Sequence, residues 1–180
     1  MIRHCIHQLA RKLVNATKLK QAPYSPKLNE LSGGIRHVVY EYSNLVCAHV
    51  YLEAHPDGGP TAILVLNAFL LSIRLLAGFL GKPTGKPDIL ATHYSGQAPR
   101  RLQEFGKRKD AIDKQLAHIS YARVTKPQPD LADVNTGRAL FAELRTAFLD
   151  FLSTVQEKTH RDEFAKWLAM RSAETGCALP

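Results

Sequence analysis

The chain has 180 residues, of which 45% are hydrophobic, and its formal net charge is +8. A chain of this length fits one domain and can bury about two-thirds of its unfolded surface, so it needs no disulfide to fold. The apolar content excludes a wholly disordered chain. The positive charge favours an anionic partner, such as nucleic acid or an acidic protein surface, without identifying one.

The three cysteines, Cys5, Cys47 and Cys177, are far apart in the sequence and form no CxxC pair. This spacing is typical neither of a zinc knuckle nor of a disulfide framework. We expect buried or inert thiols in a reducing compartment, and hence a cytoplasmic protein. The sequence indicates no metal site and no small-molecule cofactor.

Residues 1–22 are predicted to form a basic amphipathic helix that docks on the rest of the domain. They contain no acidic residue, since Glu30 is the first in the chain. Their apolar side chains recur at helical spacing, at Ile2, Ile6, Leu9, Leu13 and Ala16. An acid-free amphipathic N-terminus is also found in organellar transit peptides, so targeting stays open as an alternative.

Helical periodicity dominates the rest of the chain, and no stretch alternates at a period of two for long. We therefore predict a single all-α domain, 1–180. Its core is an up-and-down bundle of four main helices in residues 26–158, with the N-terminal helix added to it. Residues 159–180 are predicted to be a C-terminal extension, helical over about 160–171 and frayed from Glu174.

The first helix of the bundle is predicted over residues 26–54. Ser25 is well suited as its N-cap and Pro26 as its first helical residue. Gly33 and Gly34 either weaken the start of this helix or mark a kink where another helix approaches.

The second helix, residues 61–80, is the most apolar stretch of the chain. Its length and composition would suit a membrane span. Asn67, Ser72 and Arg74 argue against a span, since an arginine near the bilayer centre costs about 2.5–3.5 kcal/mol. We expect instead a buried central helix of the bundle, apolar nearly all round, and no membrane partner.

Three more helices are predicted farther along the chain. A short one starts near Asp88 and includes Ile89 and Ala91, and a long one follows over about 99–122. The last long helix covers about 134–158, where apolar and aromatic residues again recur at helical spacing.

The strongest local feature is the cationic segment from Lys107 to Arg123. Residues four apart share a helix face, so Lys114 lies one turn from His118. A histidine beside cations can transfer protons while the cations hold a phosphate, as ribonuclease chemistry by 2′-hydroxyl attack requires. The alternative is a packed histidine that is hydrogen-bonded to a neighbouring helix, because apolar residues surround His118 in the sequence.

Asn67–Leu80, Asp88–Tyr94 and Asp113–Arg123 occur in an order and spacing that resembles HEPN-superfamily proteins of the abortive-infection type. Asp113–Arg123 is similar to the Asn-Lys-x-x-x-His-Leu-Thr-x-x-Arg stretch of that family. The resemblance covers about residues 60–155. It implies a helical bundle, often dimeric, found in defence and toxin systems. Many members of the family are metal-independent ribonucleases with an Arg-x(4–6)-His motif, so the resemblance also implies this activity.

The resemblance assigns His118 as the general acid/base, but the arginine of the motif is missing. The expected positions hold Ala111, Ile112 and Asp113, and Arg108 lies too far upstream. Cations from other positions must then neutralise the phosphate, and the candidates are Lys114, Arg123 and Arg74.

Arg74 has a structural alternative, because a buried arginine is rare unless it is paired. The acids that could pair with it are Asp88, Asp113 and Glu143.

For the whole protein, we expect a homodimer that binds or cleaves RNA in bacterial defence or a toxin–antitoxin system. The alternative is a non-catalytic binding or assembly module with a degenerate active site.

Overall fold

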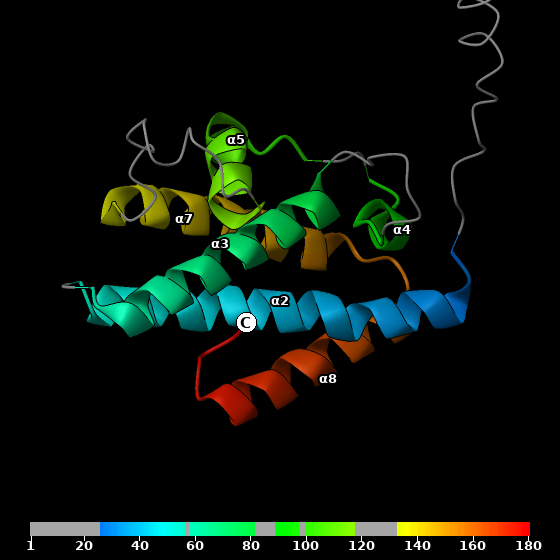
Figure 1. The fold of residues 1–180 in the computed structure, drawn as a ribbon. Coiled ribbons are helices and arrows are strands. Elements are labelled where there is room, and N and C mark those ends of the chain that lie inside the picture. Colours follow the sequence, from blue (N-terminus) through cyan, green and yellow to red (C-terminus); the bar gives the residue numbers. More distant parts are fainter. Residues whose placement is uncertain (1–25, 57, 82–88, 98–99, 118–132) are drawn as a thin grey trace, which may run out of the picture.

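The computed structural model describes residues 26–56, 58–81, 89–97, 100–117 and 133–180, and these residues fold into helices without a strand (Figure 1). The all-α class is therefore confirmed. The helix predicted over 1–22 lies outside the described residues. The helices are α2 (Leu28–Ala54), α3 (Pro60–Leu80), α4 (Thr92–Ser95), α5 (Gln103–Ala117), α7 (Val134–Thr154) and α8 (Lys158–Thr175).

Helix α2 is the central element of this arrangement. It packs against α3, α7 and α8, while α3 also contacts α5 and α7. Figure 1 shows α2 between α3 and α8, so both sides of this long helix are covered. At its middle the fully buried Tyr42 ring stacks on Phe148 of α7 with the ring centroids 4.0 Å apart. The apolar stripe predicted for this helix therefore forms the core.

Several helices begin at residues other than those predicted, because different caps are used. Helix α2 begins at Leu28 rather than Pro26, and the Lys27 amide donates a hydrogen bond of 2.7 Å to the Glu30 carboxylate. The short helix α4 begins at Thr92 rather than near Asp88. Helix α7, in contrast, begins at Val134 as predicted, after Asp133, whose side chain accepts a 2.8 Å hydrogen bond from the Thr136 amide.

Gly34 lies where the segment that contains Ile89 and Tyr94 approaches α2 closely. A close approach was one of the two interpretations of Gly33 and Gly34. A Cβ atom at Gly34 would lie 2.7 Å from both Ile89 Cδ1 and Tyr94 Oη. A Cβ atom at Gly33 would meet nothing within 4 Å. The absence of a side chain at Gly34 lets the Tyr94 hydroxyl reach α2 and donate a 2.8 Å hydrogen bond to the Leu31 carbonyl.

Helix α3 is less buried than predicted. Among the described helices, it alone is long and apolar enough to cross a membrane by length and composition, and 44% of its most apolar window is buried. Phe69, Leu70 and Ile73 are buried, whereas Leu64 is 70% exposed. The prediction of a buried helix therefore holds for the face that α2, α5 and α7 contact, whereas none of these described helices covers the face that carries Leu64.

The C-terminal residues are packed rather than frayed. Helix α8 is separated from α7 by residues 155–157 and buries Phe164 and Leu168 in the same core cluster as α2. After α8, Cys177 forms a disulfide with Cys47 of α2, with the two Cα atoms 5.9 Å apart. The expectation of separate inert thiols was therefore wrong for these two cysteines. Residues 130 positions apart become neighbours only because α8 folds back along α2.

Candidate functional site

The predicted site begins on α5, which a carboxylate of a neighbouring helix holds at its first turn. Glu143 of α7 accepts hydrogen bonds from the amides of Gln103, Glu104 and Phe105, at 2.6, 3.0 and 2.9 Å. These amides have no partner within the helix, and a negative charge at a helix N-terminus is favourable. Glu143 therefore positions α5 and is not the partner of Arg74.

Arg74 binds Asp113, one of the three acids considered for it. Its Nε atom donates a 2.6 Å hydrogen bond to Asp113 Oδ1, while Lys109 Nζ lies 2.6 Å from Asp113 Oδ2. The hydrogen bond from Lys109 lowers the pKa of Asp113 most. Partial burial raises this pKa and the hydrogen bond from Arg74 lowers it further, so the pKa lies below its usual value. Asp113 thus joins α3 to α5. The Arg74 side chain is 49% exposed, so this arginine lies at the surface.

Most cations near the start of α5 are paired within the helix. Glu104 binds Lys107 at 2.5 Å and also binds Arg108. Lys114, one turn before the end of the described helix, is exposed. His118 and Arg123 lie outside the described residues. The four predicted site residues are Arg74, Lys114, His118 and Arg123. The structure describes the first two, and it brings Arg74 to Asp113, which precedes Lys114 in the chain.

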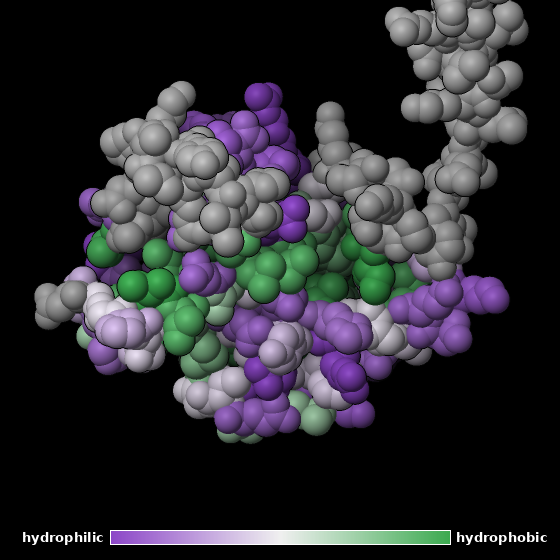
Figure 2. All heavy atoms as spheres, in the orientation of Figure 1, coloured by the Kyte–Doolittle hydropathy of each residue, from purple (hydrophilic) through white to green (hydrophobic). Residues whose placement is uncertain are grey.

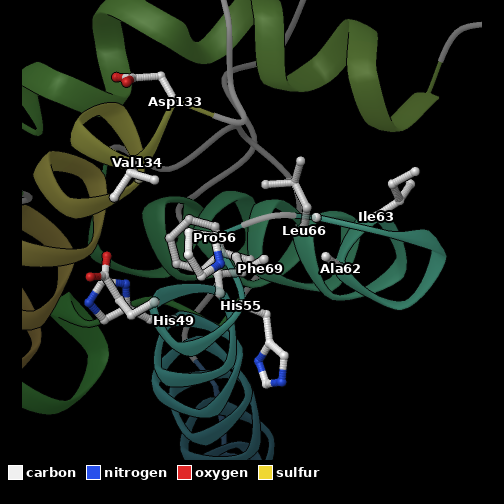
Figure 3. Close-up of a pocket in the computed structure, with 13 residues that line it drawn as sticks. His49, His55, Pro56, Ala62, Ile63, Leu66, Phe69, Asp133 and Val134 are labelled. Atoms are coloured by element: carbon white, nitrogen blue, oxygen red, sulfur yellow. The ribbon is translucent and has the colours of Figure 1, made fainter.

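A second candidate site lies at the opposite end of α3, and the sequence reasoning missed it. A cavity of about 140 Å³ opens between the end of α2, the start of α3 and the start of α7 (Figure 3). Its apolar wall includes Leu52, Leu66 and Phe69, and its polar groups include His49, Glu53 and Asp133. His55 also borders the cavity, but its ring points away from the other labelled side chains and stacks on Tyr51.

The polar groups of this cavity are held in fixed positions. Arg138 binds the Glu53 carboxylate through two nitrogens, at 2.9 Å from Nε to Oε1 and 2.5 Å from Nη2 to Oε2. This hydrogen bonding lowers the pKa of Glu53. The His49 ring stacks on Phe141 with the ring centroids 3.8 Å apart. Burial lowers the pKa of His49 and thereby favours the neutral imidazole, which offers one donor and one acceptor.

The sequence contains only a weak signal for this cavity. His49 and Glu53 are four residues apart on a helix, which places them on one face. Asp133 is recognisable as a helix cap, but it is 80 residues from Glu53. Nothing local predicts that α7 begins beside the turn between α2 and α3.

No family model matches this chain, and no curated protein or solved structure matches it significantly.

Proposed function

We propose that this protein is a HEPN-like, cytoplasmic RNA-binding protein of a bacterial defence or toxin–antitoxin system. The segment that begins in α5 contacts the RNA, and His118 acts as general acid/base in metal-independent cleavage. The observation that carries the proposal is the contact between Arg74 and Asp113. It brings a cation of α3 to the part of α5 that carries Lys114, one turn before His118 in the sequence. Cations from two helices thus lie beside the segment that leads to His118, with Arg74 paired to Asp113 and Lys114 exposed.

If His118 is the general acid/base, His118→Ala should lower the rate of RNA cleavage at least 100-fold, because general acid–base catalysis accelerates a reaction about 10²–10⁴-fold. The measurement is the cleavage rate of single-stranded RNA in the presence of EDTA, with RNA retention measured in parallel. His37→Ala, an exposed histidine on α2, is the control and should cleave like wild type. Equal cleavage by wild type and His118→Ala, or no cleavage by either, excludes the catalytic assignment.

One observation favours the non-catalytic alternative. Asp113 stands where the family motif has an arginine, and it binds Arg74 and Lys109, two cations that cleavage could otherwise use. A carboxylate here repels a phosphate instead of neutralising it. RNA binding that falls with added salt, survives His118→Ala and occurs without cleavage would support a binding or assembly module.

We also propose a homodimer formed through the uncovered face of α3. Leu64, Leu71 and Leu75 lie on one side of this helix and are 70%, 44% and 43% exposed. Figure 2 shows apolar atoms along the middle of the molecule where α3 runs. Arg74, the one charged residue of α3, is bound to Asp113, so a two-fold contact between two copies of this face meets little charge repulsion.

If the dimer forms through this face, Leu71→Lys should halve the molar mass measured by light scattering. The lysine would lie in an apolar two-fold contact near the same lysine of the second copy, and the two like charges would separate the protomers. Val50→Lys is the matched control, since Val50 is 55% exposed but lies on α2. It should leave the mass unchanged. A monomeric wild type, or a Leu71→Lys variant with the mass of the wild type, contradicts the dimer.

A further inference from the structure

The uncovered face of α3 carries a regular stripe of apolar and small residues. Its members are exposed and follow one another at intervals of four, three, four and three residues: Leu64, Ala68, Leu71, Leu75 and Gly78. These intervals keep side chains on one side of a helix and are those of a coiled-coil seam. A Cβ atom at Gly78 would meet nothing within 4 Å, so this end of the stripe is also open.

The N-terminal segment of the chain has an apolar stripe with the same intervals. Its members also follow one another at four, three, four and three residues: Ile2, Ile6, Leu9, Leu13 and Ala16. The two stripes can therefore be paired residue by residue, from Ile2 with Leu64 to Ala16 with Gly78. In this pairing Leu9 matches Leu71, and the small Ala16 matches the residue without a side chain. Equivalent positions of two parallel helices face each other in this way.

The chain between this segment and α2 is long enough for such a pairing. Helices α2 and α3 run in opposite directions, so the start of α2 lies toward the end of α3 (Figure 1). These two ends are joined through Ala91 and Tyr94, which donate hydrogen bonds of 2.9 and 2.8 Å to carbonyls of α3 and α2, respectively. Residues 17–27 lead from the segment to α2 and can span roughly 36 Å when extended. Ala16 can therefore reach Gly78, and the segment then runs antiparallel to α2, as in an up-and-down bundle.

Charge also permits this contact. Arg11 and Lys18 are on the side of the predicted N-terminal helix opposite its apolar stripe, so they stay in water. Arg74 is the one charged residue of α3, and it is bound to Asp113. Repulsion between the two helices is therefore small. A helix of this length is marginal on its own in water, so the apolar face that it packs against supplies its stability.

We propose that residues 2–16 form a helix that covers the α3 stripe of the same chain and competes there with a second copy. The docked segment removes Leu64, Leu71 and Leu75 from water, as the second copy does in the dimer, so the face cannot hold both. Because the segment is tethered, its effective concentration at α3 does not depend on the protein concentration. Docking therefore weakens the dimer. The competition rests on the proposed dimer, whereas the docking does not.

The test compares two variants of the full chain, Leu9→Glu and Val14→Glu. Leu9 belongs to the N-terminal stripe, whereas Val14 lies on another side of the predicted helix and receives the same charge. Hydrogen exchange at a protein concentration too low for dimers measures the protection of the amides of residues 2–16. These amides should be protected in wild type and in Val14→Glu, and they should exchange about tenfold faster or more in Leu9→Glu.

Variants of the folded helices show whether the segment packs on the proposed face. Leu71→Lys places a charge where Leu9 packs, so it should abolish the protection of residues 2–16. Val50→Lys is the control on α2 and should keep it, since Val50 is 55% exposed and lies outside the stripe. The proposal is overturned by wild-type amides that exchange like those of an unfolded peptide, by equal protection in Leu9→Glu and Val14→Glu, or by protection that survives Leu71→Lys.

Sedimentation at increasing protein concentration separates the segment from the dimer. The dimer should be roughly tenfold tighter in Leu9→Glu than in Val14→Glu, because only molecules with a free stripe can associate. Equal dimer dissociation constants in the two variants overturn the competition. The expected protection without self-association of any variant keeps the docked segment and excludes the dimer. A dimer of equal strength in both variants, without protection of residues 2–16, keeps the dimer and overturns the docked segment.

Discussion

Removing the disulfide between Cys47 and Cys177 should lower the free energy of unfolding by about 2–5 kcal/mol. The bond closes a loop between residues 130 positions apart, and a long closed loop restricts the unfolded chain strongly. In the folded protein it ties the segment after α8 to α2. Urea unfolding of oxidised wild type and Cys177→Ser measures the difference. Cys5→Ser, which leaves this bond intact, is the control.

A reducing agent should shift the wild-type unfolding curve to that of Cys177→Ser. A wild-type curve that does not respond to reductant contradicts the disulfide. Thiol counting on freshly denatured protein also tests the predicted cytoplasmic location, because structural disulfides are rare in a reducing cytoplasm. Three reactive thiols would agree with that location and contradict the disulfide, since the chain has three cysteines. A single reactive thiol favours an oxidising compartment.

Replacing His160 by leucine should raise the free energy of unfolding by about 1–2 kcal/mol. His160 is 3% exposed, and neither ring nitrogen has a hydrogen-bond partner among the described residues. A buried polar group without a partner costs about 1–3 kcal/mol. The ring meets the Tyr94 ring edge-on at 5.4 Å, and loss of that contact offsets about 0.5–1.5 kcal/mol. Leucine is apolar and has nearly the volume of histidine, so it suits the site.

Chemical unfolding of His160→Leu and of His37→Leu measures this effect. His37 is exposed on α2, so its replacement should change the free energy of unfolding by less than about 0.5 kcal/mol. A marked loss of stability in His160→Leu would show that the imidazole has a polar partner in solution.

The existence of the long helices was predictable from the sequence, as were some of their ends, such as the end of α3 at Leu80, but other ends were not. Apolar residues at helical spacing predicted helices close to α2, α3 and α7, because burial of one face needs that spacing whatever the partner is. The ends depend on which side chains accept the free amides. At α5 that acceptor is Glu143, about 40 residues farther along the chain, so local reasoning placed the start too early.

The described residues include two of the four predicted site residues, Arg74 and Lys114. The sequence limited the partner of Arg74 to three acids, and packing of α3 against α5 selected Asp113. The Arg74 side chain is 49% exposed in this ion pair. The apolar residues around it in the sequence had suggested a buried arginine. The roles of His118, Lys114 and Arg123 stay predictions.

The sequence by itself determined the helical class, the positions of the main helices and the strong positive charge. Each of these depends on residues within a few turns of one another or on composition. The tertiary structure alone decided the disulfide, the uncovered face of α3 and the cavity beside Phe69. Each of these joins or exposes side chains from segments far apart in the chain, and their distances are set by how the helices pack rather than by any local pattern.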